Sequence, residues 1–351
     1  MKGISKPRML FVCVIQAVVL GTSATPALAA FPGTNGRIAF ESGRTDEFDL
    51  YSAKPDGSGL KRITAGIVED HAPAWAPGGK RIVFYRSMAG GPGNIWVMNA
   101  DGTGKEQLTS GPADDGDPAW APGGKRIVFW RATATHAADL FIMNADGTGK
   151  RRLTTNPNAD IGPVWSGTGL IAFTSFRTGG GDVYVIRPDG TGLHRLTTGP
   201  AADYYPDWSP NGKRIAFFRS KSGVQSRGDV FVMRADGTGQ VRLTASPAAD
   251  TRPAWSPNGQ RIAFMSSRFH GFFDIWTMKP NGSDLRHVTH DGFADGLPDW
   301  QPARRGEQIR PLRSLSRCCL LSRRDFGELA GRSGGDHVPL VWSHQQDGLD
   351  E

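Results

Sequence analysis

Short apolar segments separated by polar turns run through most of the 351-residue chain. In residues 81–84 and 95–98, for example, Ile, Val, Phe and Trp dominate, and Gly, Pro or Asp residues bound the segments. Segments of this length that are rich in β-branched and aromatic residues are typical of strands rather than helices. Because both faces of these segments are apolar, we expect each sheet to pack against a neighbour on either side.

The segments belong to a repeat that is marked by tryptophan. Its six copies follow one another at spacings of 45, 45, 43, 47 and 45 residues: Trp75, Trp120, Trp165, Trp208, Trp255 and Trp300. An Asp stands five residues before each Trp, a Pro stands two before it, and an Asp-Gly or Asn-Gly turn recurs with the same spacings. Asp-Gly favours a tight hairpin, because a type I′ turn needs positive φ at both central residues. A period of roughly 40–45 residues with four short strands is typical of a β-propeller blade.

The two ends of the repeat region complement each other. Residues 36–64 supply a second, third and fourth strand with no Trp strand before them, whereas residues 295–302 supply a Trp strand alone. We therefore predict an all-β, six-bladed β-propeller of four-stranded blades over residues 30–302. Blade one combines three N-terminal strands with one C-terminal strand, which closes the ring and leaves no open sheet edge there.

The N-terminal residues 1–29 predict a signal peptide. They carry Lys2, Lys6 and Arg8, then an apolar run over residues 9–20, and end in Ala27-Leu28-Ala29. The charged start, apolar run and A-x-A ending are the features of a secretory leader, and the run is too short to span a bilayer. An uncleaved anchor is the alternative. We expect an exported protein, periplasmic or secreted, with no membrane span after cleavage.

Residues 303–351 show neither the tryptophan spacing nor the Asp-Gly turn. We predict a disordered, non-repeat C-terminal tail; a frame-shifted end is the alternative. The adjacent pair Cys318-Cys319 in this segment implies no stabilising disulfide for the propeller.

Charge and motifs exclude several classes of function. The formal net charge of +7 falls by three when residues 1–29 are removed, and a net charge of about +3 on the propeller suits solubility rather than capture of a polyanion. Nucleic acid is therefore not an expected partner. The sequence has no H-E-x-x-H, P-loop, paired C-x-x-C or dinucleotide fingerprint, so it lacks the common motifs of metalloproteases and nucleotide-binding enzymes.

The repeat also resembles a known family. The pattern D-x-x-P-x-W-[AS]-P-x-G-[KQ]-R-I-[AV]-F, then [DN]-[IVL]-[WFY]-x-M, D-G-T-G and L-T, over residues 36–302, resembles the propeller repeats of the TolB family. The resemblance implies the fold and a role at the cell envelope. TolB carries an α/β domain before its propeller, which we expect to be missing here, and this argues against a role in the Tol–Pal complex. Similar repeats occur in oligogalacturonate lyases and in prolyl oligopeptidases, whose hydrolase domain has no counterpart in this sequence.

The candidate site is the mouth of the central channel, where the loops that enter the Trp strands gather. These loops bring six repeated aspartates into one ring: Asp70, Asp115, Asp160, Asp203, Asp250 and Asp295. We favour a structural role, with each carboxylate accepting hydrogen bonds from turn N–H groups. In the alternative, the carboxylates face a common space and need a cation.

Positions that differ between copies are the candidate binding residues. We expect His71, Asp117 and His290 on one side of the mouth, and Tyr204, Tyr205 and Arg252 on the other, as a set suited to gripping a peptide or a sugar. A solvated polar rim is the plain alternative, because loops are generally rich in such residues. A site for calcium or a transition metal would use the following residues: Asp70, His71, Asp115, His290, Asp291 and Asp295.

These observations predict a monomeric, exported binding module for a protein or peptide at the cell envelope, without catalysis and without a cofactor. Because one fold hosts many activities, two alternatives stay open. One is a metal-assisted polysaccharide lyase or other glycan-active enzyme that uses the channel mouth. The other is a structural envelope protein with no specific ligand.

Overall fold

The computed structural model describes residues 32–303, except 89–90, 134, 221–226 and 270. This part of the chain contains 24 strands and no helix, and so offers no helix that could cross a membrane. The predicted signal peptide and, apart from residue 303, the predicted tail lie outside the described residues.

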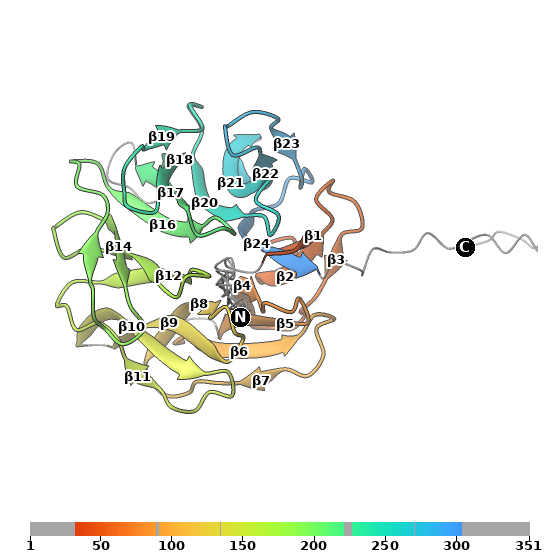
Figure 1. Cartoon of the computed structure of the whole chain (residues 1–351). Coiled ribbons are helices and arrows are strands. Elements are labelled where there is room, and N and C mark those ends of the chain that lie inside the picture. Colours follow the sequence, from red (N-terminus) through yellow and green to blue (C-terminus); the bar gives the residue numbers. More distant parts are fainter. Residues whose placement is uncertain (1–31, 89–90, 134, 221–226, 270, 304–351) are drawn as a thin grey trace, which may run out of the picture. The chain divides into compact units, whose positions relative to one another are not determined.

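The strands form six four-stranded antiparallel sheets arranged around a central channel (Figure 1). Five sheets use four consecutive strands each. Blade two contains β4 (Glu69–Trp75), β5 (Arg81–Ser87), β6 (Asn94–Asn99) and β7 (Glu106–Gln107). Blade three contains β8 (Asp114–Trp120), β9 (Arg126–Thr133), β10 (His136–Asn144) and β11 (Arg151–Arg152). Blade four contains β12 (Asp160–Trp165), β13 (Ile171–Ser175), β14 (Asp182–Ile186) and β15 (His194–Arg195). Blade five contains β16 (Asp203–Trp208), β17 (Arg214–Ser220), β18 (Gly228–Arg234) and β19 (Val241–Arg242). Blade six contains β20 (Asp250–Trp255), β21 (Ile262–Phe269), β22 (Phe272–Met278) and β23 (Arg286–His287).

Blade one joins the two ends of the repeat region. It contains β24 (Asp295–Ala303), β1 (Thr34–Ser42), β2 (Asp49–Ala53) and β3 (Lys61–Arg62), in that order across the sheet. The antiparallel register of β24 on β1 places Trp300 opposite Ile38 and Ala303 opposite Thr34. In Figure 1 the blue β24 accordingly lies beside the red β1. The predicted six-bladed fold and its closure by one C-terminal strand are confirmed.

The core lies between neighbouring blades. One cluster, for example, joins Leu50 and Ile63 of blade one to Trp75 and Phe84 of blade two, all at most 7 % exposed. A tryptophan side chain buries about 150–250 Å², which at about 25 cal/mol per Å² contributes roughly 4–6 kcal/mol. The repeated Trp therefore holds each inner strand against the adjoining sheet, and this fixes the positions of the channel-lining residues.

The Asp-Gly turns also contribute to packing between blades. At Gly102 the backbone has a φ of 93°, and a Cβ there would lie 2.2 Å from the carbonyl oxygen of Ile63 in the preceding blade. Asp101 stabilises the same turn, because its Oδ1 accepts bonds from the N–H and hydroxyl of Thr103 at 3.0 and 2.7 Å. Glycine is thus required at this turn both by the positive φ and by the close approach of the neighbouring blade.

Candidate functional site at the channel mouth

Each repeated aspartate pairs with an arginine at or just after the end of the second strand of its own blade. Asp115 is fully buried and accepts bonds from Nε and Nη2 of Arg131 at 2.6 and 2.7 Å. The guanidinium also lies over the ring of Phe141, with its Cζ 5.3 Å from the ring centroid. The six pairs are Asp70–Arg86, Asp115–Arg131, Asp160–Arg177, Asp203–Arg219, Asp250–Arg268 and Asp295–Arg44.

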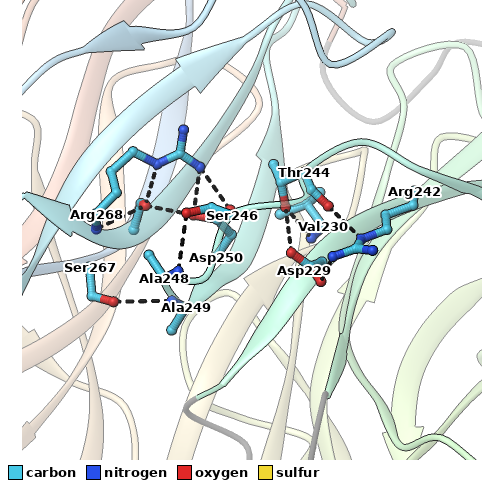
Figure 2. Close-up of polar contacts among 11 residues, drawn as sticks. Asp229, Val230, Arg242, Thr244, Ser246, Ala248, Ala249, Asp250, Ser267 and Arg268 are labelled. Carbon is cyan, nitrogen blue, oxygen red and sulfur yellow. Dashed lines mark hydrogen bonds and ion pairs between the residues drawn. The ribbon is translucent and has the colours of Figure 1, made fainter.

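Figure 2 shows the Asp250–Arg268 pair together with a second kind of pair, between Asp229 and Arg242 in the outer strands of blade five. In blades two, three and five the arginine donates to the aspartate through both Nε and Nη2. In blades one, four and six Nη2 alone reaches the aspartate, and Nε donates to a serine hydroxyl. Hydrogen bonds between such charged groups are stronger than neutral ones. The aspartate ring therefore ties the first and second strands of every blade together. The sequence argument favoured turn N–H groups as the partners; the observed partners are arginine side chains.

The predicted metal ligands are largely engaged in such contacts. Each of the three repeated aspartates in that set faces an arginine: Asp70, Asp115 and Asp295. Asp291 lies 3.1 Å from Nη2 of Arg44, and His290 is exposed, with its ring 5.5 Å from that of His287. Within the described residues, no three His, Cys, Asp or Glu side chains are grouped so that they could hold a metal ion.

Two residues after each repeated aspartate, every inner strand has a left-handed backbone. The φ values there are 46° for Ala72, 43° for Asp117, 59° for Gly162, 50° for Tyr205, 51° for Arg252 and 51° for Leu297. The ladder between first and second strand shifts register at this point in each blade, as in a β-bulge. These six residues line the channel, and we call them the bulge ring. Left-handed backbone costs roughly 1–2 kcal/mol at a residue with a Cβ, so the fold holds five such side chains in place at a cost to stability.

Three members of the bulge ring contact one another across the mouth. Blades three and six are opposite in the ring of six, yet Nη1 of Arg252 from blade six reaches to 3.4 Å from Oδ1 of Asp117 in blade three. The Cζ of Arg252 also lies 3.3 Å from the centroid of the Tyr205 ring. Asp117 is held in turn by Nε1 of Trp130, which donates a bond of 2.9 Å to Oδ2.

The electrostatics follow from this geometry. Burial raises the pKa of Tyr205 to about 12, although the charge of Arg252 acts in the opposite direction. For Arg252, burial lowers the pKa, but the charges of Tyr205 and Asp117 together with those of Glu41 and Tyr85 outweigh it, so the pKa is raised. Arg252 therefore stays a cation that spans the channel mouth.

His71 lies near the Asp117–Arg252 ion pair and close to two carboxylates. Its Nδ1 is 2.9 Å from Oε2 of Glu41, and its Nε2 is 3.6 Å from Oε2 of Glu69. The ring stacks on Tyr85, with centroids 5.0 Å apart. Burial lowers the pKa of His71, but the hydrogen bonds and charges of Glu41 and Glu69 outweigh this and raise it. Protonation of His71 is thus favoured by two carboxylates.

The predicted candidate set is only partly brought together. Asp117, Tyr205 and Arg252 meet, although the sequence argument placed Asp117 on the side of the mouth opposite the other two. Tyr204 is 3 % exposed and packs on the rings of Phe176 and Phe218, away from the channel. His71 lies near the Asp117–Arg252 ion pair, whereas His290 follows β23, the outermost strand of blade six.

Sequence reasoning missed Glu41, Asp207 and Asp299. Glu41 follows the repeated Phe of the second strand, where the other blades have Tyr85, Trp130, Thr174, Phe218 and Met265. Asp207 and Asp299 stand between the repeated Pro and Trp, where the other blades have Ala74, Ala119, Val164 and Ala254. In each case the signal was a charged residue at a position that is uncharged in the other copies.

Asp207 and Asp299, which we call the channel aspartates, also line the channel, two residues after the bulge-ring residues of their strands. Oδ2 of Asp207 accepts the backbone N–H of Trp255 at 2.5 Å, and Oδ2 of Asp299 accepts that of Trp75 at 2.6 Å. Both carboxyls are surrounded by protein and keep part of their surface open to the channel. Burial, with a smaller contribution from the charge of Asp299, raises the pKa of Asp207 to about 8. Burial likewise raises the pKa of Asp299 to about 7.

Taken together, the closed ring of six sheets and its varied channel lining define a β-propeller with a candidate binding site at the channel mouth. Two overlapping stretches, residues 115–227 and 200–312, match the model of the TolB beta propeller domain and together cover more than half of the chain. The chain belongs to the TolB β-propeller family.

Solved structures show the same fold. TolB from Acinetobacter baumannii is similar with a TM-score of 0.68 and 22 % identity, over 78 % of this chain and 67 % of that one. A putative TolB from Agrobacterium tumefaciens gives 0.60 and 20 %, over 78 % and 93 % of the two chains. Hydrazine synthase from Kuenenia stuttgartiensis gives 0.67 and 16 %, over 79 % of this chain and 48 % of that one. No curated protein matches the chain.

Proposed function

We propose that this protein is an exported binding module whose channel mouth holds a protein or peptide at the cell envelope, without catalysis. The TolB-like fold supports a protein-interaction module in general terms. The features of a leader in residues 1–29 support export.

The observation that carries the proposal is the bulge ring. Six inner strands share one strained backbone conformation, and the side chains that they present there are all different. Strain of this kind is concentrated at sites of recognition and catalysis. The ring combines a partly exposed cation and an aromatic ring, since the side chain of Arg252 is 27 % exposed and its guanidinium lies over Tyr205. Arginine and tyrosine, together with tryptophan, are enriched among the residues that contribute most of the binding energy at protein interfaces.

Photo-cross-linking from the mouth tests the proposal. A photoreactive phenylalanine in place of Tyr205 keeps an aromatic ring at the bulge ring. The matched control carries the same group at Val241 in the outer strand β19, which is 57 % exposed. In intact producing cells we expect position 205, but not position 241, to form a discrete cross-linked species that mass spectrometry assigns to one partner. The absence of a cross-link from position 205, or the same products from both positions, would overturn the proposal.

The enzymatic alternative is tested by metal content and by the melting temperature with and without a chelator. If a stoichiometric metal co-purifies and its removal lowers the melting temperature, a metal-assisted activity on glycans replaces the binding module as the leading function. A protein that is indifferent to the chelator and yields one cross-linked partner supports the binding module. Indifference to the chelator with no partner supports the structural alternative.

A further inference from the structure

The two channel aspartates are not required by the blade fold. At the same position, four residues after the repeated aspartate, three blades have alanine and one has valine: Ala74, Ala119, Ala254 and Val164. The backbone pairing of the inner strand is nevertheless the same in these blades. Asp207 and Asp299 are therefore additions to a framework that forms without them.

Neither aspartate has a cationic partner among the described residues. Among the described residues, Asp299 is the charged group that raises the pKa of Asp207, and it is itself negative; no cation is among the causes that shift the pKa of either carboxyl. The nearby cation of the mouth, Arg252, is engaged by Asp117 and Tyr205. Each carboxylate accepts two backbone N–H groups, those of Trp255 and Trp208 for Asp207 and those of Trp75 and Trp300 for Asp299. Since an ionised carboxylate has about four acceptor sites, each can still accept a further donor. Buried carboxyls with raised pKa values in a cavity are candidates for a functional site.

The space beside them is small and mostly apolar. The cavity has a volume of about 180 Å³, and its walls are the Pro and Trp residues of all six inner strands. Sites for drug-sized ligands usually measure roughly 300–1,000 Å³, so this cavity suits a single side chain rather than a whole small molecule.

We propose that the channel binds one cationic group of a peptide, an ammonium or guanidinium, between the carboxylates of Asp207 and Asp299. This inference rests on the proposed function and names the chemistry of its ligand: a segment with an accessible lysine, arginine or N-terminal amine. An apolar wall with two carboxylates matches the aliphatic stem and charged head of such a side chain. Calcium fits less well, because it takes six to eight oxygen ligands. Three carboxylates line this cavity, and one of them, Asp117, is already engaged by Arg252 and Trp130.

Proton release gives the site a measurable signature. At this level of the channel the other four inner strands contribute no charge, since they carry Ala74, Ala119, Val164 and Ala254. A bound cation favours the charged form of a nearby carboxyl. With pKa values of about 8 and 7 in the empty channel, binding near neutral pH releases protons, and the affinity rises as the pH rises from 6 to 9.

Calorimetric titration of the purified full-length protein with the capped tripeptide acetyl-Arg-Arg-Arg-amide tests the proposal. The matched probe is the same peptide with citrulline, which keeps the shape and loses the charge. The test variant is Asp207→Asn with Asp299→Asn, which keeps an acceptor for each Trp N–H. The control variant is Asp101→Asn with Asp146→Asn, which removes two exposed carboxylates from the Asp-Gly turns.

We expect the wild type and the control variant to bind the arginine peptide at least tenfold more tightly than the test variant does. We also expect the citrulline peptide to bind at least tenfold more weakly, and the wild-type affinity to rise with pH. A second variant, Asp207→Ala with Asp299→Ala, uses the residue that three other blades have at this position and should behave like the asparagine variant. Melting temperatures of all variants establish that each is folded.

No binding of the arginine peptide, equal binding by the test variant, or equal binding of the citrulline peptide would each overturn the inference. The inference would also be overturned if the peptide did not bind and calcium chloride alone bound to the wild type but not to the test variant. The proposed function is judged separately, by the cross-link from position 205. If the test variant captures the same partner with unchanged yield, the binding module stands and only the cationic site is lost.

Discussion

Asp203 and Asp207 lie on the same strand of blade five but differ in their burial and in their partners. Asp203 begins β16, is fully buried, and is paired with Arg219 at 2.7 Å. Asp207 lies four residues further along, and its hydrogen-bond partners are the backbone N–H groups of Trp255 and Trp208. The same contrast recurs on β24, where Asp295 is paired with Arg44 and Asp299 accepts the backbone N–H groups of Trp75 and Trp300.

The difference separates what the fold requires from what the channel adds. The paired aspartate occurs in all six blades, where it joins first and second strands. The unpaired aspartate occurs in two blades and replaces a small apolar residue. Removing one partner of a buried ion pair is more damaging than removing a charge that has no ion partner, because the first leaves an uncompensated charge and the second takes one away.

The largest expected effect comes from breaking a pair of the ring. Arg131→Met leaves the fully buried Asp115 without its guanidinium, and loss of one partner of a buried pair costs about 3–5 kcal/mol. We expect urea unfolding to show a loss of that size in the free energy of unfolding. The control is Arg126→Met on the same strand, at an exposed position, with a loss below about 1 kcal/mol. Equal losses for the two variants would contradict the structural role of the ring.

A smaller effect, of opposite sign, is expected from the unpaired aspartates. Their pKa values in the folded protein, about 8 and 7, lie above the ordinary value of 3.8. The folded state therefore holds protons that the unfolded state releases, and stability falls as pH rises from about 4 to 8.

Asp207→Asn with Asp299→Asn removes this part of the pH dependence. Since one pKa unit corresponds to about 1.4 kcal/mol, we expect the variant to gain about 2 kcal/mol relative to the wild type between pH 7 and pH 9. Urea unfolding at the two pH values provides the comparison. A difference between the proteins that does not change with pH would show that neither carboxyl titrates in this range.

The sequence predicted the fold because its markers are strictly periodic. Tryptophan, proline and the turn glycine recur in step, and the incomplete first and last units identified the strand that closes blade one. The arginine partners escaped notice because their distance from the aspartate is not constant. It is 16 residues in blades two, three and five, 17 in blade four and 18 in blade six. In blade one the partners are 251 residues apart.

The site could be predicted only in outline. Side chains alternate between the two faces of a strand, so Tyr204 and Tyr205 cannot both face the channel, and the sequence alone did not say which does. The left-handed bulge that directs Arg252 toward Asp117 leaves no signature in composition, because Ala, Asp, Tyr, Arg and Leu all occupy it. Glycine, the residue that prefers this backbone, is found there only in blade four, at Gly162.

The smallest effect tests the strain at the bulge ring. Ala72 has a φ of 46°, and its substitution by glycine relieves strain of roughly 1–2 kcal/mol while making the unfolded chain more flexible, at a cost of about 0.4–1 kcal/mol. We expect a net gain of about 0.5–1 kcal/mol in the free energy of unfolding. The control is Ala74→Gly on the same strand, where the backbone is not left-handed and glycine should lose about 0.5–1 kcal/mol. If Ala72→Gly also destabilises the protein, the bulge is not strained, and the fold holds its five side chains at the channel without a cost to stability.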